Sequence, residues 1–204
     1  MNRTRAFTLI ELIVSIGIIS LISAVVFFNF PQFNQTVHLN RSARELTIAL
    51  REAQARAIAV TPLTDGTIPD NYGVFVEQTS TTDINGGYVI FSDLDGDLKY
   101  DTPDPLVCTG ECIKRITFTN NIKITGIDVG GTSYAGFHVF YRRPDPIVVI
   151  SDQGAVCIAG PSSIAGCSGG SYGPFTITIS RPQGHDPSQV KKVEVYRTGQ
   201  ISIL

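Results

Sequence analysis

The chain has 204 residues, of which 43% are hydrophobic and 17% are charged, and its formal net charge is −2. A charge so close to zero argues against a general binder of polyanions such as nucleic acids, although it is compatible with a local basic patch. The chain contains no Trp but 19 Gly and 11 Pro, which favours turn-rich β structure. Its length suffices for an N-terminal anchor and one further domain with its own core.

The most apolar stretch comprises residues 7–30, FTLIELIVSIGIISLISAVVFFNF, and Glu11 is its only formal charge. About 20 apolar residues suffice for a helix to cross a bilayer. A charge within such a helix costs roughly 2.5 to 3.5 kcal/mol on insertion scales, so the carboxylate is expected to have a function. A secretory signal peptide would have a shorter, uncharged core followed by a small-residue cleavage site. A plain N-terminal anchor would leave Glu11 without a purpose.

Beyond this stretch, apolar residues recur at alternating spacings of four and three. This pattern predicts an amphipathic helix that packs on its own sheet, in preference to a free coiled coil. Both stretches together predict one helix from about residue 8 to 60, roughly 80 Å long at 1.5 Å per residue and ended by Pro62. The apolar stripe comprises Leu39, Ala43, Leu46, Leu50, Ala53, Ala57 and Val60.

The rest of the chain alternates with a period of two and is rich in Val, Ile, Phe, Tyr and Thr, which predicts strands separated by Gly, Pro and Asp turns. Tight turns are expected at Asn120-Asn121 and Thr198-Gly199. The predicted strands are 72–77, 87–92, 113–119, 122–127, 136–142, 147–151, 175–180, 190–197 and 200–204.

An acidic segment, DLDGDLKYD, follows the second predicted strand. Calcium takes six to eight oxygen ligands, and alternating carboxylates in a tight loop can converge on one ion. We therefore consider a calcium site formed by Asp93, Asp95, Asp97 and Asp101. The spacing differs from an EF-hand, and Glu111 lies too far along for the usual bidentate ligand. The alternative is an acidic turn in which Asp serves the turn geometry.

All four Cys lie in the C-terminal body. They allow three pairings, and two local bridges, Cys108 to Cys112 and Cys157 to Cys167, are the simplest. Zinc is the rival interpretation, but the pairs lack the usual two-residue spacing and no His lies near either pair.

No motif indicates an enzyme. The chain contains no G-x-S-x-G, no H-E-x-x-H and no P-loop, and no nucleophile motif surrounds His38, His138 or His185. Two cations, Arg3 and Arg5, precede the apolar stretch. The positive-inside rule therefore predicts that the C-terminal body lies outside the cytoplasm, where disulfides form.

The N-terminal sequence A-FTLIELIVSIGIISLI, residues 6–22, resembles the N-terminus of type IV pilin precursors and type II secretion pseudopilins. In this family prepilin peptidase cuts a short basic leader just before a Phe, and the fifth residue of the mature chain is Glu. The resemblance implies cleavage between Ala6 and Phe7, with Ala6 in place of the usual Gly. It also implies that the freed amine of Phe7 meets Glu11 of a neighbouring subunit during assembly, since such a pair cancels isolated charges.

The body resembles H-type pseudopilins (GspH) and FimT-like minor pilins through short pieces such as RELTIALREAQARAIAV, DNYGVFVE and KKVEVYRTGQISIL. This resemblance implies an α+β fold in which a long N-terminal, membrane-spanning helix packs on an antiparallel β-sheet head. The implied divisions are a leader (1–6), a transmembrane and filament-core helix (7–30), an amphipathic helix (31–60) and a β-rich globular head (61–204).

We therefore expect a structural minor pilin or pseudopilin of a type IV pilus or type II secretion pseudopilus. Its partners would be other subunits, prepilin peptidase and the inner membrane, which it crosses once before it joins a periplasmic or extracellular filament. The alternative is a DNA-binding minor pilin of a DNA-uptake pilus, because FimT-like minor pilins include DNA-binding members. Lys191, Lys192 and Arg197 are the candidate contacts, although scattered cations usually belong to a solvated surface.

Overall fold

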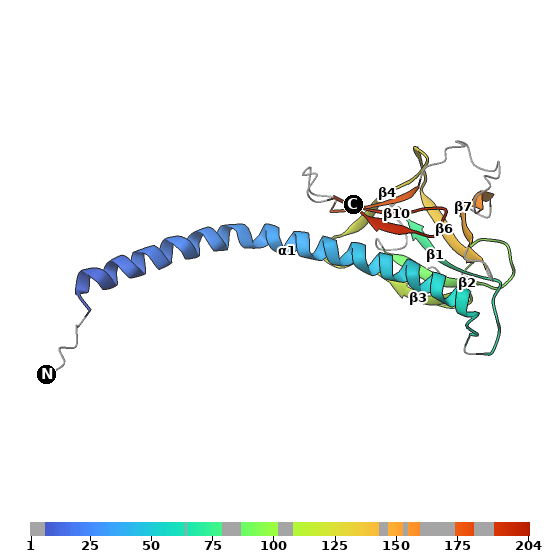
Figure 1. Cartoon of the computed structure of the whole chain (residues 1–204), viewed down its shortest axis with the longest axis horizontal. Coiled ribbons are helices and arrows are strands. Elements are labelled where there is room, and N and C mark those ends of the chain that lie inside the picture. The colour runs from blue at the N-terminus through green and yellow to red at the C-terminus, as the bar shows by residue number, and fades with distance from the viewer. Residues whose placement is uncertain are drawn as a thin grey trace. The chain divides into compact units, whose positions relative to one another are not determined.

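The computed structural model describes residues 7–63, 65–78, 87–101, 108–142, 147–152, 155–159, 174–181 and 190–204. Side chains are described in these ranges except at 28–33, 147, 152 and 155–159. The described part contains one helix and eleven strands (Figure 1), and the chain divides into two compact units, Met1–Val37 and His38–Leu204.

The helix, α1, spans Leu9–Ala59 and continues through Pro31, which confirms the helix predicted over residues 8 to 60. At its N-terminus the backbone N–H of Glu11 donates to Thr8 Oγ1 over 3.4 Å. A Thr followed three residues later by Glu is the capping-box spacing, which satisfies backbone donors that the first helical turn leaves free. The sequence thus specifies where the helix begins.

The C-terminus of α1 is closed by a Schellman motif. The N–H of Val60 donates to the Ala57 carbonyl and the N–H of Thr61 to the Arg56 carbonyl, the two bonds that define this motif. Val60 has a φ of 49°, in the left-handed region that Gly usually occupies at this position and that strains a β-branched residue. The helix therefore ends at Ala59, ahead of Pro62, because the chain already turns at Val60.

Two antiparallel sheets form the head. Their strand orders are β3-β2-β1-β6-β7-β8 and β11-β10-β9-β4-β5. The first sheet contains β1 (Asn71–Glu77), β2 (Tyr88–Asp93), β3 (Cys112–Ile116), β6 (Gly136–Arg142), β7 (Ile147–Asp152) and β8 (Ala155–Ala159). The second contains β4 (Lys123–Val129), β5 (Thr132–Ser133), β9 (Phe175–Ser180), β10 (Val190–Val195) and β11 (Ile201–Ile203).

Each of the nine predicted strands has a counterpart in these sheets, with ends that differ by at most three residues. The turn at Asn120-Asn121 has φ of 60° and 58°, as a type I′ turn requires. Gly199, with φ of 80°, completes the turn between β10 and β11. β5 and β8 were outside the prediction, because β5 has only two residues and β8 adjoins a segment rich in Gly and Ser, a composition typical of loops.

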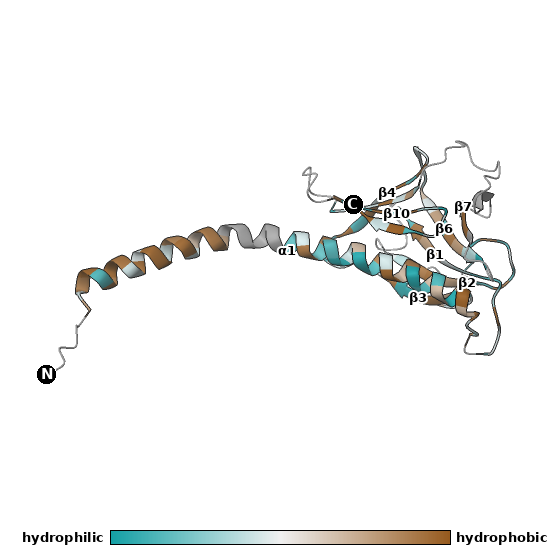
Figure 2. Cartoon of the chain, viewed as in Figure 1, coloured by the Kyte–Doolittle hydropathy of each residue, from teal (hydrophilic) through white to brown (hydrophobic). Residues whose placement is uncertain are grey.

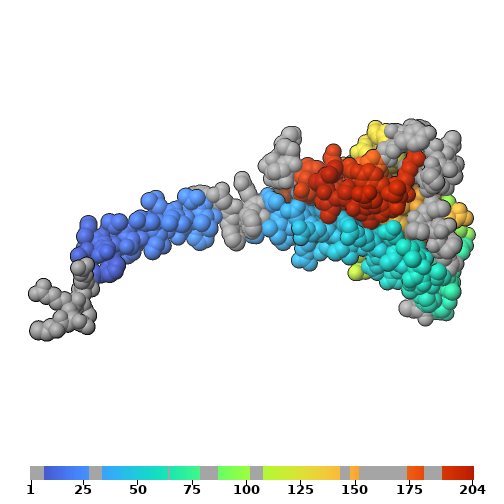
Figure 3. Space-filling view, in the orientation of Figure 1, coloured from blue at the N-terminus to red at the C-terminus, as the bar shows by residue number. Residues whose placement is uncertain are grey.

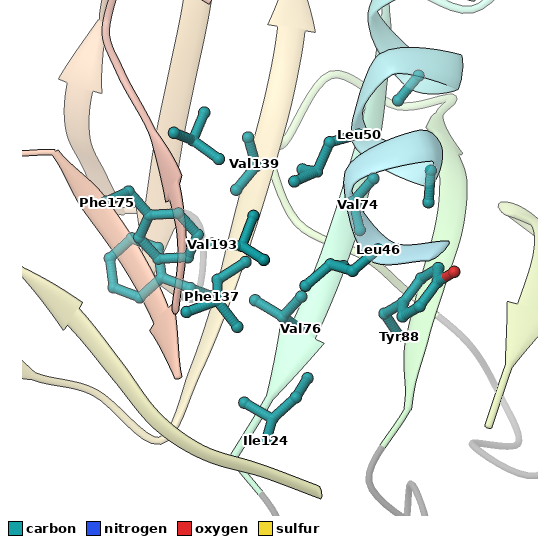
Figure 4. Close-up of a cluster of buried hydrophobic side chains, with 14 of the residues drawn as sticks. Leu46, Leu50, Val74, Val76, Tyr88, Ile124, Phe137, Val139, Phe175 and Val193 are labelled. Carbon is teal, nitrogen blue, oxygen red and sulfur yellow. The ribbon is translucent and has the colours of Figure 1, made fainter. Parts of the chain in front are cut away.

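The second half of α1 supplies one wall of the head's core. The predicted stripe is buried from Leu39 to Ala57, and only its last member, Val60, is exposed. Leu46 and Leu50 contact a cluster that includes Val74 of β1 and Val193 of β10, so the helix packs on both sheets (Figure 4). This confirms the prediction of a helix packed on its own sheet.

The turn between β10 and β11 also contacts the helix. A Cβ at Gly199 would lie 2.8 Å from Gln54 Nε2, so the turn and the helix are in close contact there. In Figure 3, β10 and β11 (red) lie along the second half of α1. The last two strands therefore complete the cover of the helix's buried face.

Candidate functional site

The first candidate site is the apolar segment of α1, Leu9–Phe27. It is long and apolar enough to cross a membrane by length and composition, and none of it is buried by the rest of the described chain. In Figure 2 this segment is largely hydrophobic (brown), with a hydrophilic patch near its N-terminal end, and its sequence has no polar stripe along one face. A helix that is hydrophobic all round is typical of a membrane span or of a helix inside a larger assembly.

Glu11 is the one charged side chain of this segment and lies in the first turn of α1. The positive end of the helix macrodipole favours a carboxylate at this position. Ser15 Oγ donates to the Glu11 carbonyl over 2.7 Å, which satisfies a second polar side chain of the segment within the helix. The position therefore suits a negatively charged side chain.

The predicted cleavage site lies at the edge of the described chain. Phe7 is 73% exposed and directly precedes Thr8, which caps the helix. Ala6 and the rest of the predicted leader lie outside the described residues. In a chain that begins at Phe7, the new amine would stand next to the first turn of α1, the turn that contains Glu11.

The second candidate site is the acidic loop, which we define as residues 93–101. One carboxylate oxygen from each of Asp93, Asp95 and Asp97 lies within 4.8 Å of the others. Asp93 is buried at the end of β2, whereas the other two are exposed. Asp101 lies outside this cluster, and its Oδ1 accepts a hydrogen bond of 2.6 Å from Lys99 Nζ. The loop thus brings together three of the four predicted calcium ligands.

The Glu111 side chain accepts hydrogen bonds from both ends of the acidic loop. Its Oε1 accepts from the backbone N–H of Leu94 at 2.8 Å, and its Oε2 accepts from that of Asp101 at 2.9 Å. Its backbone carbonyl accepts from the N–H of Ser92. Burial raises the pKa of the Glu111 carboxyl, an effect that the two backbone donors oppose. A single buried carboxylate therefore fixes both the start and the end of the loop.

A disulfide closes the turn that contains Glu111. Cys108 and Cys112 are bonded, with a Cα–Cα distance of 5.1 Å, as one of the two predicted local bridges requires. Gly110 supplies a φ of 65° within the turn, a conformation that Gly adopts at little cost. The second predicted bridge, Cys157 to Cys167, lies outside the described side chains and stays a prediction.

The predicted DNA contacts do not gather on one face of β10. Lys191 and Lys192 are consecutive strand residues, so their side chains point to opposite faces of the sheet. Lys192 is exposed and Lys191 is partly buried. Arg197 follows the strand in the turn to β11 and is also partly buried.

His138 is a core residue of the head. It is 3% exposed, and its ring stacks on that of Phe75 with the ring centres 4.7 Å apart. Burial lowers the pKa of His138 to about 4. A neutral imidazole that stacks on a neighbouring ring is typical of a buried residue that packs the core. The sequence around His138 contains no nucleophile motif.

Two residues of the acidic-loop site were outside the sequence-based prediction. Asn71 in β1 pairs with Asp93 in β2, and its Nδ2 donates to Asp93 Oδ2 at 2.8 Å. Glu111 was named only to exclude it as an EF-hand ligand. Strand register brings Asn71 to the loop, and a single sequence gives no signal for that register. For Glu111, its position between two Cys of a predicted bridge is the available signal.

The comparisons with known proteins bear on the N-terminal site. The family model of the prokaryotic N-terminal methylation motif matches residues 1–27. No curated protein and no solved structure matches the chain, so the resemblance of the body to GspH and FimT-like proteins stays a prediction. The matched residues contain the predicted cleavage site, Glu11 and the exposed apolar segment of α1. The chain therefore carries the prepilin signature of the type IV pilins and pseudopilins, a class of structural subunits, not enzymes, that prepilin peptidase processes.

Proposed function

We propose that the protein is a minor pilin or pseudopilin, whose N-terminal helix lies first in the inner membrane and then in the core of a type IV pilus or type II secretion pseudopilus. Its head stands outside the cytoplasm, because Arg3 and Arg5 precede the apolar segment and stay on the cytoplasmic side. Its function is structural: the helix polymerises, and the head is displayed on the filament.

The uncovered apolar segment of α1 carries this proposal. Leu9, Ile10 and Leu21 are each at least 67% exposed, and the described head covers none of the segment from Leu9 to Phe27. Exposed apolar surface costs about 25 cal/mol per Å², so a surface of this extent requires a cover. Lipid covers it in the precursor, and the helices of neighbouring subunits cover it in the filament.

Glu11 gives the assembly its register. Cleavage before Phe7 frees an amine that is a cation near the membrane interface, while Glu11 places an anion inside the apolar segment. An isolated charge is costly there, and pairing the Phe7 amine of one subunit with the Glu11 carboxylate of its neighbour removes both isolated charges. Since the pair forms only when two helices stand at the right offset, it selects one axial position for each new subunit.

The test replaces the carboxylate by its neutral isostere. Cells that express the full chain with Glu11→Gln are expected to insert the precursor normally but to incorporate it into filaments at least about tenfold less, since a buried amine loses its partner. Immunogold labelling of sheared filaments and membrane fractionation measure the two quantities. Glu45→Gln is the matched control, because Glu45 lies on the same helix in an exposed pair with Arg41. Normal incorporation of the Glu11→Gln subunit would contradict the proposal.

Mass spectrometry of the filament protein gives a second, independent reading. The expected mature chain lacks residues 1–6 and begins at Phe7 with a methylated amine, as the matched motif predicts. A filament subunit that retains the leader would have no free amine at Phe7, and the pairing with Glu11 would then be impossible.

DNA capture is the alternative function. Its support is the resemblance of the body to FimT-like minor pilins, and its candidate contacts are Lys191, Lys192 and Arg197. A DNA-binding head would show an affinity that falls steeply with salt, and it would lose that affinity when Lys191 and Lys192 are replaced by Gln. The opposite directions of these two side chains in β10 favour the structural function.

A further inference from the structure

The acidic loop and Glu111 concentrate negative charge around a small volume of the head. The described residues there include five carboxylates, those of Asp93, Asp95, Asp97, Asp101 and Glu111, against one ammonium, that of Lys99. Lys99 is committed to Asp101. Lys99 also attracts Asp95 and Asp97, but none of the three carboxylates of Asp93, Asp95 and Asp97 forms a salt bridge within the described part of the chain.

The oxygens of this cluster are spaced for one ion. The three ligand atoms lie within 4.8 Å of one another, and two oxygens on opposite sides of a calcium ion at 2.3 to 2.6 Å are separated by about that distance. Asp93, Asp95 and Asp97 each use one oxygen to accept a backbone N–H of the loop, those of Gly96, Asp97 and Lys99. Asp95 and Asp97 thus each keep a second oxygen, whereas the second oxygen of Asp93 also accepts from Asn71 Nδ2. The loop already holds these side chains in position.

A second observation, independent of the carboxylates, comes from the neighbouring strand. Asn71 is only 5% exposed, and its side chain contacts the cluster through the bond of 2.8 Å from Nδ2 to Asp93 Oδ2. Its Oδ1 is buried and has no hydrogen-bond partner. A buried carbonyl oxygen without a partner costs about 1 to 3 kcal/mol. Amide oxygens are ordinary calcium ligands, so this atom, on a side chain already bonded to Asp93, is a candidate fourth ligand.

The close spacing of the carboxylates also favours a cation. Asp93, Asp95 and Asp97 place one oxygen each within 4.8 Å of the others. Ionised carboxylates at this spacing repel one another, and a bound cation would relieve that repulsion.

We propose that Asp93, Asp95, Asp97 and the side-chain oxygen of Asn71 bind one calcium ion. The donors are all oxygens, which suits a hard cation rather than zinc or copper. They lie on a loop and a strand end, with Asp95 and Asp97 exposed, so water completes the shell and the coordination number of six to eight that calcium requires is reached. Asp101 takes no part, because it binds Lys99.

The experiment is a calcium titration of the full chain, purified in a non-ionic detergent and stripped of metal with a chelator. Calorimetry is expected to give one ion per chain with a Kd of about 10⁻⁴ to 10⁻³ M, the range of extracellular calcium modules. Thermal melting followed by circular dichroism is expected to show a calcium-dependent rise in Tm, because the ion binds only the folded loop. The absence of saturable heat up to about 10 mM calcium would overturn the proposal.

Single substitutions distinguish calcium binding at this site from nonspecific attraction of calcium to acidic side chains. Asp95→Asn is expected to weaken calcium binding at least about tenfold, and Asn71→Leu to do the same, since each removes a ligand. Asp101→Asn is the matched control from the same loop and is expected to leave the affinity unchanged within about threefold. Asp95→Asn alters an exposed residue, so it tests the site even if Asn71→Leu lowers the melting temperature without calcium. Binding that survives Asp95→Asn unchanged, or that Asp101→Asn abolishes, would overturn the assignment.

Discussion

The two halves of α1 bury their apolar residues in different ways. Between Leu9 and Phe27 apolar side chains lie on every face, with Glu11 as the one charge, and the described chain buries none of the segment. Between Leu39 and Ala57 most apolar residues lie on one buried stripe, while Arg41, Arg44, Arg51 and the apolar Ile48 are exposed. One continuous helix therefore has an N-terminal half that needs an apolar environment on all sides and a second half that needs one on a single side.

The contrast shows that the hydrophobic content of a helix and the period of its hydrophobic pattern predict different features of its surroundings. The first half has no preferred face, so its cover can be lipid or several helices around it. The second half can be covered from one side only, and the two sheets of the head provide that side. Changes in the second half should therefore alter the stability of the head, whereas changes in the first half should alter insertion and assembly.

The largest effect on the head is expected from its buried stripe. Leu46 is fully buried and packs between both sheets, so Leu46→Ala should cost about 2 to 5 kcal/mol through lost burial and the cavity that remains. Thermal melting followed by the β signal in circular dichroism would measure the loss.

Two other positions on α1 serve as controls for this prediction. Ile48 is 63% exposed on the same half of the helix, and Leu21 is 71% exposed on the first half. Changing either residue to Ala should leave the stability of the head within about 0.5 kcal/mol. A destabilisation by Leu21→Ala equal to that of Leu46→Ala would mean that the apolar segment also supports the head, and the contrast would fail.

A smaller effect is expected from acid, and it should be confined to the head. The pKa of His138 is about 4 in the fold because the ring is buried, against about 6.5 in an unfolded chain. The unfolded state binds more protons between these values, so stability falls as pH drops from 6.5 towards 4. The loss should reach about 2 kcal/mol at pH 5.

The contribution of His138 is isolated by comparing melting curves of the wild type and of His138→Gln between pH 5 and pH 7. The comparison is needed because burial raises the pKa of Asp93 and Glu111, which acts in the opposite direction. The Gln variant should lose most of the acid sensitivity. Parallel curves for the two proteins would show that the imidazole does not titrate on unfolding.

The smallest effect is expected at the end of α1, and it should be a gain. Val60 holds the left-handed position of the Schellman motif, where a side chain with a Cβ costs about 1 to 2 kcal/mol. Val60→Gly should therefore stabilise the head by up to about 1 kcal/mol, after the greater flexibility of Gly in the unfolded chain is subtracted. Val60→Ala keeps the Cβ and should give little of this gain.

Sequence patterns predicted the helix and the strands well because the hydrophobic periods of 3.6 and 2 residues can be read from neighbouring residues in the sequence. They also predicted that Asp93, Asp95 and Asp97 converge, since alternate residues in one tight loop stay near one another. They missed that Asp101 is taken by Lys99, because a competing ion pair depends on side-chain geometry. They missed Asn71 because its approach to Asp93 depends on the register between β1 and β2, which pairs residues distant in sequence.

The disulfide between Cys108 and Cys112 makes the turn next to the acidic loop depend on the redox conditions around the head. This bond forms in oxidising surroundings outside the cytoplasm, and the turn that it closes contains Glu111, whose carboxylate holds Leu94 and Asp101. In the topology proposed above, a head still in the reducing cytoplasm would therefore lack this bond across the turn. The bonded turn would then form only after the head has crossed the membrane.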